Sequence, residues 1–199
     1  MTTYRLLSAN ASPYSSKVRM AAAHAGIPLD LVATSTAEQP PELMKANPLA
    51  KIPVLLVGDG QPIHDSPVIV RYLDRVSGGR LFPGDAEART RAEVLEAVAD
   101  GICDALLAHV SERRYRPEAI VHQPWLDKQW GKVTRSLAWL EASPPSLDDL
   151  DAGKIAVRAA LGYLALRFAG QWEGDCPGLV AWARAFDARY PALKDCVPR

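Results

Sequence analysis

The first candidate for chemistry is Ser12, in the segment Ser12-Pro13-Tyr14-Ser15. The segment joins a strand-like apolar run, residues 4–9, to a helical pattern over residues 15–25. A helix N-terminus offers free backbone amides and a partial positive charge, so it can hold a thiolate to which a serine hydroxyl donates a hydrogen bond. Taken alone, Ser12 is better explained as an N-cap, with Pro13 at the first helical position.

The second candidate is the segment Lys51-Ile52-Pro53-Val54, at the start of another apolar run. Proline cannot donate to a strand ladder, so it belongs at the beginning or edge of a strand. A cis bond before Pro53 would leave the backbone amide and carbonyl of Ile52 free to pair with a peptide ligand as a β-strand does. An ordinary edge-strand proline is the alternative.

The third candidate is Asp65-Ser66-Pro67, before a helical pattern over residues 66–77. Ser66 fits the N-cap of this helix, with Pro67 at its first position. The functional alternative is that Asp65 pairs with an ammonium group, while the amide and hydroxyl of Ser66 bind a carboxylate. These groups would then hold a small zwitterion.

Short strands and helices separate the three candidates. The pattern predicts strands at 4–9, 29–33, 53–57 and 62–63, helices at 15–25, 40–45 and 66–77, and a hairpin turn at 58–60. From residue 87 onward the long segments are helical, at 87–112, 117–142, 151–169 and 177–189. Asp151 is the expected N-cap of the third of these helices.

The composition excludes several classes of protein. The 199 residues include 23 basic and 23 acidic ones, so the chain lacks the basic surface of a nucleic-acid-binding protein. No apolar run approaches the roughly 20 residues needed to span a bilayer, and the N-terminus lacks the features of a signal peptide, so we expect a cytoplasmic protein with no membrane partner. The three cysteines and four histidines show no disulfide or ligand spacing, so we expect no metal.

The order and placement of these segments resemble the glutathione S-transferase family over nearly the whole chain. Family members usually read N-P-x-x-x-[VI]-P-x-L and then [ED]-S-x-x-I-x-x-Y-L, which residues 47–55 and 65–73 match. Residues 150–163 resemble the buried helix of small bacterial members, and Ser12-Pro13-Tyr14 resembles their zeta- and omega-like first turn. The resemblance implies a thioredoxin-like βαβαββα domain with a mixed four-stranded sheet over 1–79, a linker over 80–86 and an all-helical domain over 87–199.

The resemblance also implies residue roles. Ser12 corresponds to the catalytic serine of zeta-like members, and Ile52 to the backbone that binds the cysteinyl part of glutathione, with Pro53 cis. Asp65 and Ser66 correspond to the pair that binds the γ-glutamyl group. Gln39 and Lys51 compete for the glycyl carboxylate. The implied glutathione-binding set is Ser12, Pro13, Gln39, Lys51, Ile52, Pro53, Asp65 and Ser66.

The implied activity is that of a transferase which attacks a small electrophile with the glutathione thiolate, in detoxification, as a homodimer and with glutathione as co-substrate. Two alternatives remain: a non-catalytic binding or interaction protein with the same fold, and a thioredoxin-like redox enzyme, which the lack of a cysteine near Ser12 disfavours. The sequence leaves the electrophile open, and also whether Ser15 or Ser16 activates the thiol instead. Helix position alone suggests Ala105, Leu106, His109 and Tyr115 for the second-substrate site.

Overall fold

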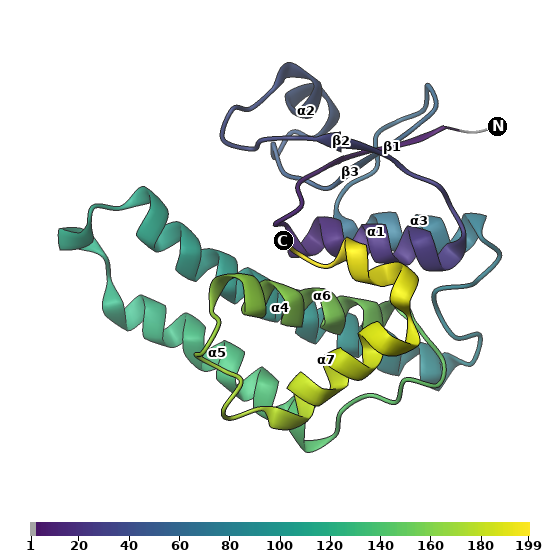
Figure 1. Cartoon of the computed structure of the whole chain (residues 1–199). Coiled ribbons are helices and arrows are strands. Elements are labelled where there is room, and N and C mark those ends of the chain that lie inside the picture. Colours follow the sequence, from purple (N-terminus) through teal and green to yellow (C-terminus); the bar gives the residue numbers. More distant parts are fainter. Residues whose placement is uncertain (1–2) are drawn as a thin grey trace.

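The computed structural model describes residues 3–199, and its first part contains all the strands. The elements of this part are β1 (Tyr4–Ser8), α1 (Pro13–Ala25), β2 (Asp30–Ala33), α2 (Pro41–Ala46), β3 (Val54–Val57) and α3 (Ser66–Val76). The strands form one sheet in the order β2-β1-β3, in which β1 is parallel to β2 and antiparallel to β3. Figure 1 shows α1 and α3 on one face of this sheet and α2 on the other.

The predicted fourth strand at residues 62–63 is wrong. Ile63 exchanges two backbone hydrogen bonds of 2.9 Å with Leu55, but this pairing is an isolated bridge. Pro62 has no N–H to extend the ladder, and α3 already begins at Ser66. The described sheet therefore has three strands instead of four.

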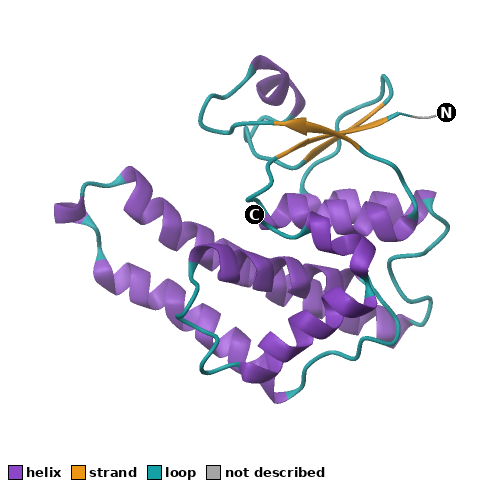
Figure 2. Cartoon of the chain, viewed as in Figure 1, coloured by secondary structure: helices purple, strands orange, loops and turns teal. Residues whose placement is uncertain are grey.

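The rest of the chain is helix and loop, as Figure 2 shows. Its elements are α4 (Ala86–Tyr115), η1 (Glu118–Ile120), α5 (Gln123–Ala142), α6 (Ala152–Arg167), α7 (Pro177–Arg189) and η2 (Pro191–Cys196), where η denotes a 3₁₀-helix. The predicted helix over 117–142 is too long, because α5 begins only at Gln123. Pro124 is tolerated in the first turn of α5 but would break the hydrogen-bond ladder of a longer helix. None of the helices in residues 3–199 combines the length and apolarity that crossing a membrane requires.

One continuous hydrophobic core joins the sheet and its two covering helices to the helical part. Its members include Leu6 of β1, Val18 of α1, Ile69 of α3, Leu106 of α4 and Leu161 of α6. α6 is buried along nearly its whole length and packs against both α1 and α4. The shared core therefore holds α1, which follows Ser12, in place against the helical part.

The helix caps explain where α1 and α6 begin. The Oγ of Ser12 accepts a hydrogen bond from the Ser15 amide at 3.2 Å, and the Oδ1 of Asp151 accepts one from the Lys154 amide at 2.9 Å. Both caps were predicted. The prediction for α3 is wrong by one residue, because Asp65 is the cap residue and Ser66 is already helical.

Candidate functional site

The three candidate segments border the same end of the sheet. β1 runs toward Ser12, and the antiparallel β3 begins beside the end of β1, because Leu7 is paired with Val54. The bridge between Leu55 and Ile63 is also antiparallel. The residues that follow Ile63 and lead into α3 therefore lie opposite the residues that precede Leu55, near the start of β3. A ligand at this end of the sheet would meet all three segments.

Ser12 lies half-buried at the N-terminus of α1. Its Oγ accepts the Ser15 amide hydrogen bond, which uses a lone pair of the hydroxyl and leaves its proton available for donation. The capping role and the donor role are therefore compatible in one residue. Ser15 and Ser16 are both fully buried, so Ser12 is the most accessible of the three hydroxyls.

The loop before β3 is held by the side chain of Asn47. This side chain is buried, its Nδ2 donates to the Lys51 carbonyl at 2.8 Å, and its Oδ1 accepts from the Leu49 amide at 3.0 Å. The loop leads into the Ile52–Pro53 peptide, which is cis as expected. In the sequence Asn47 appears only as the first residue of the N-P-x-x-x-[VI]-P-x-L motif, so sequence reasoning missed its role in holding this loop.

Asp65 and Ser66 stand at the N-terminus of α3. Asp65 is exposed and its carboxylate makes no capping hydrogen bond, whereas Ser66 is 2% exposed. The peptide between His64 and Asp65 is cis. An exposed carboxylate beside free helix amides can accept an ammonium group while the amides bind a carboxylate.

Gln39 and Lys51 lie in the two loops that flank α2. Gln39 precedes the helix with a φ of 46°, and Lys51 follows it. Both side chains are exposed. Both side chains are therefore available to a ligand.

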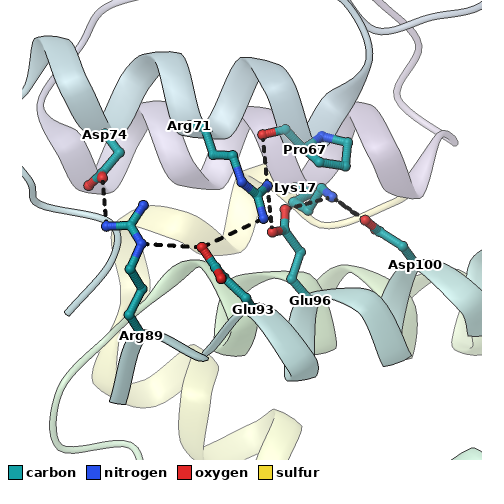
Figure 3. Close-up of polar contacts among 8 residues, drawn as sticks. All are labelled: Lys17, Pro67, Arg71, Asp74, Arg89, Glu93, Glu96 and Asp100. Atoms are coloured by element: carbon teal, nitrogen blue, oxygen red, sulfur yellow. Dashed lines mark hydrogen bonds and ion pairs between the residues drawn. The ribbon is translucent and has the colours of Figure 1, made fainter. Parts of the chain in front are cut away.

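A polar network that the sequence did not reveal lies where α1, α3 and α4 meet (Figure 3). The Lys17 Nζ is 3.1 Å from Glu96 Oε1 and 2.6 Å from Asp100 Oδ2, and Arg71 Nη1 is 3.0 Å from Glu96 Oε2. Burial raises the pKa of the Asp100 carboxyl, and Lys17 opposes that rise. The network joins the helix that follows Ser12 to α4.

Tyr14 extends this contact toward the site. Its hydroxyl donates to the Asp104 carboxylate of α4, and burial together with this hydrogen bond raises the pKa of the Tyr14 phenol. Tyr14 therefore stays protonated, and its proton is engaged with Asp104. Glu96, Asp100 and Asp104 recur every four residues, which places them on one face of α4.

The residues suggested by helix position for a second-substrate site are not brought together. Ala105 and Leu106 are buried in the core, whereas Tyr115 is 71% exposed near the end of α4. His109 lines a cavity of about 610 Å³ in the helical part, next to Trp130 and Phe168. In the part of the chain that the structure describes, no three His, Cys, Asp or Glu side chains are grouped to hold a metal ion.

Comparison with known proteins agrees with the fold. Residues 11–76 match the family described as Glutathione S-transferase, N-terminal domain. The chain is 32% identical over 182 residues to the uncharacterized GST-like protein YibF of Escherichia coli strain K12, which covers 88% of this chain and 90% of YibF.

Two solved structures are similar over the whole chain. A glutathione S-transferase from Methylobacillus flagellatus KT, solved with GSH bound, is 37% identical, with a TM-score of 0.89 over 99% of this chain and 100% of that one. A glutathione transferase family member from Pseudomonas fluorescens Pf-5, solved with bound glutathione, is 35% identical, with a TM-score of 0.88 and the same coverage.

Proposed function

Because the chain belongs to the glutathione S-transferase family, we propose that it binds glutathione and activates its thiol for attack on a small electrophile. The observation that carries the proposal is the meeting of Ser12, the cis Ile52–Pro53 peptide and Asp65 at one end of the sheet. The glutathione bound in two similar structures supports it.

Glutathione would lie across this end of the sheet in an extended form. The backbone of Ile52 pairs with its cysteinyl part, while Asp65 and Ser66 bind the ammonium and carboxylate of its γ-glutamyl group. Pro13 lies beside the sulfur, and Gln39 or Lys51 binds the glycyl carboxylate. Glutathione is thus the co-substrate, and no step needs a metal ion.

The Ser12 hydroxyl would stabilise the thiolate. A cysteine-type thiol titrates near pKa ~8.5, and lowering this by about two units requires roughly 2.7 kcal/mol of preference for the anion. One charge-assisted hydrogen bond supplies roughly 1.5–3 kcal/mol, and the N-terminus of α1 adds about 0.3–1 kcal/mol. The two contributions together are large enough.

The electrophile would enter between Ser12 and α4. The face of α4 that carries Asp100 and Asp104 continues one turn further to Ala108, which is half-buried, while Leu107 beside it is 40% exposed. We place the electrophile against Tyr14 of α1 and against Leu107 and Ala108 of α4, because these two α4 residues lie one turn beyond Asp104, which accepts the Tyr14 hydrogen bond.

The remaining features of the proposal concern the whole enzyme. Residues 1–79 form the glutathione-binding domain, 80–86 the linker and 87–199 the helical domain. The enzyme acts in the cytoplasm as a homodimer and removes toxic electrophiles. The alternative of a non-catalytic interaction protein with this fold is less favoured, because Ser12, Asp65 and Ser66 supply the polar groups that the proposed glutathione site uses.

The test measures the thiol directly. Ultraviolet absorbance of the enzyme–glutathione complex, followed against pH, should show a thiol pKa well below that of free glutathione, and a chloronitrobenzene should be conjugated. The binding-only alternative predicts binding by calorimetry with an unshifted thiol. Absence of binding would overturn both.

A further inference from the structure

Arg19 is a buried cation that the proposed mechanism does not use. It lies in α1, is 5% exposed, and its guanidinium contacts neutral acceptors. Nη1 donates to Asn10 Oδ1 at 2.8 Å, and Nη2 donates to the Cys196 carbonyl at 2.9 Å and approaches the Asn10 carbonyl at 3.5 Å. Its Nε is buried without a partner among the described residues, and burial lowers the pKa of the side chain.

These contacts connect two segments at opposite ends of the chain. Asn10 is two residues before Ser12, and Cys196 belongs to the C-terminal segment 191–199. The amide of Arg199 adds a second link, because it donates to the Asn10 carbonyl at 3.2 Å. Figure 1 shows this last stretch of chain ending beside the start of α1.

The C-terminal segment is itself anchored to the helical part. Leu193 is buried in the core. A Cβ on Gly162 of α6 would lie 2.7 Å from both Pro198 Cδ and Val197 Cγ1, so the segment packs tightly on α6. Asn10 is therefore tied, through Arg19, to a fixed point.

The Asn10 loop and its anchor border a cavity of about 880 Å³. Ser8, Ala9, Asn10 and Arg19 line this cavity, together with residues of β2 and the C-terminal segment. β2 and β3 lie on opposite sides of β1, so this cavity is on the side of the loop away from Ile52 and Asp65. Polar contacts, and not packing, hold the loop on that side.

We propose that Arg19 is a positioning residue, which ties the C-terminal segment to Asn10 and so sets the place of the Ser12 hydroxyl. The inference rests on the proposed function of Ser12. Arg19 touches neither glutathione nor the electrophile. It acts through the Asn10–Ser12 loop, so its loss should alter thiol activation more than glutathione affinity.

The test compares Arg19→Met with Arg19→Lys. The lysine keeps the positive charge but lacks the planar guanidinium, whose two Nη atoms reach Asn10 and Cys196 together. Gly162→Ala displaces the C-terminal segment without touching Arg19. Arg184→Met, the same change at an exposed position of α7, is the matched control. Each protein is measured for the thiol pKa of bound glutathione, for turnover, and for its affinity for S-methylglutathione, which has no thiol.

We expect Arg19→Met and Gly162→Ala to raise the thiol pKa and lower turnover about 10-fold, since small misplacements of a catalytic group cost rate steeply. Arg19→Lys should recover part of the loss, and S-methylglutathione affinity should change less than about 2-fold. In a Ser12→Ala background Arg19→Met should add no further rise in thiol pKa, because the two changes act through one hydroxyl.

An equal rise in both backgrounds would overturn the inference, as would an unchanged thiol pKa in a folded Arg19→Met protein. If the wild-type protein shows no lowered thiol pKa, the proposed function fails instead. Hydrogen exchange of the amides of residues 9–12 then decides the inference separately, because Arg19→Met must accelerate it and Arg184→Met must not. If Arg19→Met does not fold, the same measurements are made on Arg19→Lys and Gly162→Ala.

Discussion

The amine of Lys17 lies 3.1 Å from the carboxylate of Glu96, and the two side chains are 1% and 3% exposed. Lys17 belongs to α1 and Glu96 to α4, so this buried pair joins the helix that starts at Ser12 to the helical part. Arg71 and Asp100 complete the network and balance its charges. The position of α1 against α4 therefore depends in part on a buried ion pair that water screens little.

Lys17→Met should lower the free energy of unfolding by about 3–5 kcal/mol, because it leaves the Glu96 carboxylate with one fewer partner in a buried site. Urea unfolding followed by circular dichroism measures this. Arg91→Met is the control: Arg91 pairs with Glu87 on the surface, and its loss should cost less than about 1 kcal/mol. An equal decrease in the free energy of unfolding in the two variants would mean that the buried pair stabilises the protein no more than the surface pair does.

Ser12→Ala should lower turnover by about 10- to 100-fold and raise the thiol pKa of bound glutathione, as the loss of one charge-assisted hydrogen bond predicts. It should also cost roughly 0.5–2 kcal/mol of stability, because Ser12 caps α1. The assay is thiolate absorbance against pH for wild type, Ser12→Ala and Ser15→Ala. If the thiol pKa of bound glutathione shifts in Ser15→Ala and not in Ser12→Ala, the catalytic hydroxyl belongs to Ser15.

Asp65→Ala should weaken glutathione binding by about 1.5–3 kcal/mol, the contribution of a hydrogen bond to a charged group, and leave stability nearly unchanged, because the carboxylate makes no cap hydrogen bond. Calorimetry and thermal unfolding measure the two effects. Asp59→Ala, in the exposed turn before Gly60, is the control and should affect neither. Unchanged glutathione affinity in Asp65→Ala would remove Asp65 from the binding site.

Stability should fall as the pH drops from neutral through about 6.5, the ordinary histidine pKa. Burial lowers the pKa of His24 and His109, with smaller contributions from Arg80 and Arg113. A lowered folded-state pKa means that the unfolded chain binds more protons, so the free energy of unfolding rises with pH in this range. Urea unfolding at several pH values measures this in wild type and in the double variant His24→Gln/His109→Gln. The free energy of unfolding should depend less steeply on pH in the double variant. An identical pH dependence in the two proteins would contradict the role of these two histidines.

Light scattering at micromolar concentration should give about twice the 21.6 kDa chain mass. Val68 of α3 and Val94 of α4 are each 47% exposed, and we choose Val94 to test the proposed interface. Val94→Arg should shift the protein toward the single-chain mass and leave its helical content unchanged. A wild-type protein found only at 21.6 kDa would refute the homodimer.

Local features of this chain could be predicted from the sequence alone. The start of α1 follows from Ser12 and Pro13, and its end from Gly26, which adopts a φ of 73°. The cis peptide before Pro53 was expected only from the family resemblance. The two ends of α1 depend on residues a few positions apart, whose conformations the backbone and the caps limit directly.

Local patterns misled where two rules competed. Ile63 suits a strand, but a strand needs neighbours that can pair, and Pro62 and the early start of α3 remove them. The 117–142 segment is helical in composition, yet Pro124 is compatible only with a helix that starts beside it.

The long-range contacts were decided by the tertiary structure. Lys17 meets Glu96 across 79 residues, and Arg19 meets Cys196 across 177. Nothing in the spacing of α1 distinguishes these two cations from solvated surface residues, because their partners come from helices whose placement depends on the shared core. The sequence by itself predicted the three candidate segments and the helix cap at Ser12, and packing determined what holds those segments in position.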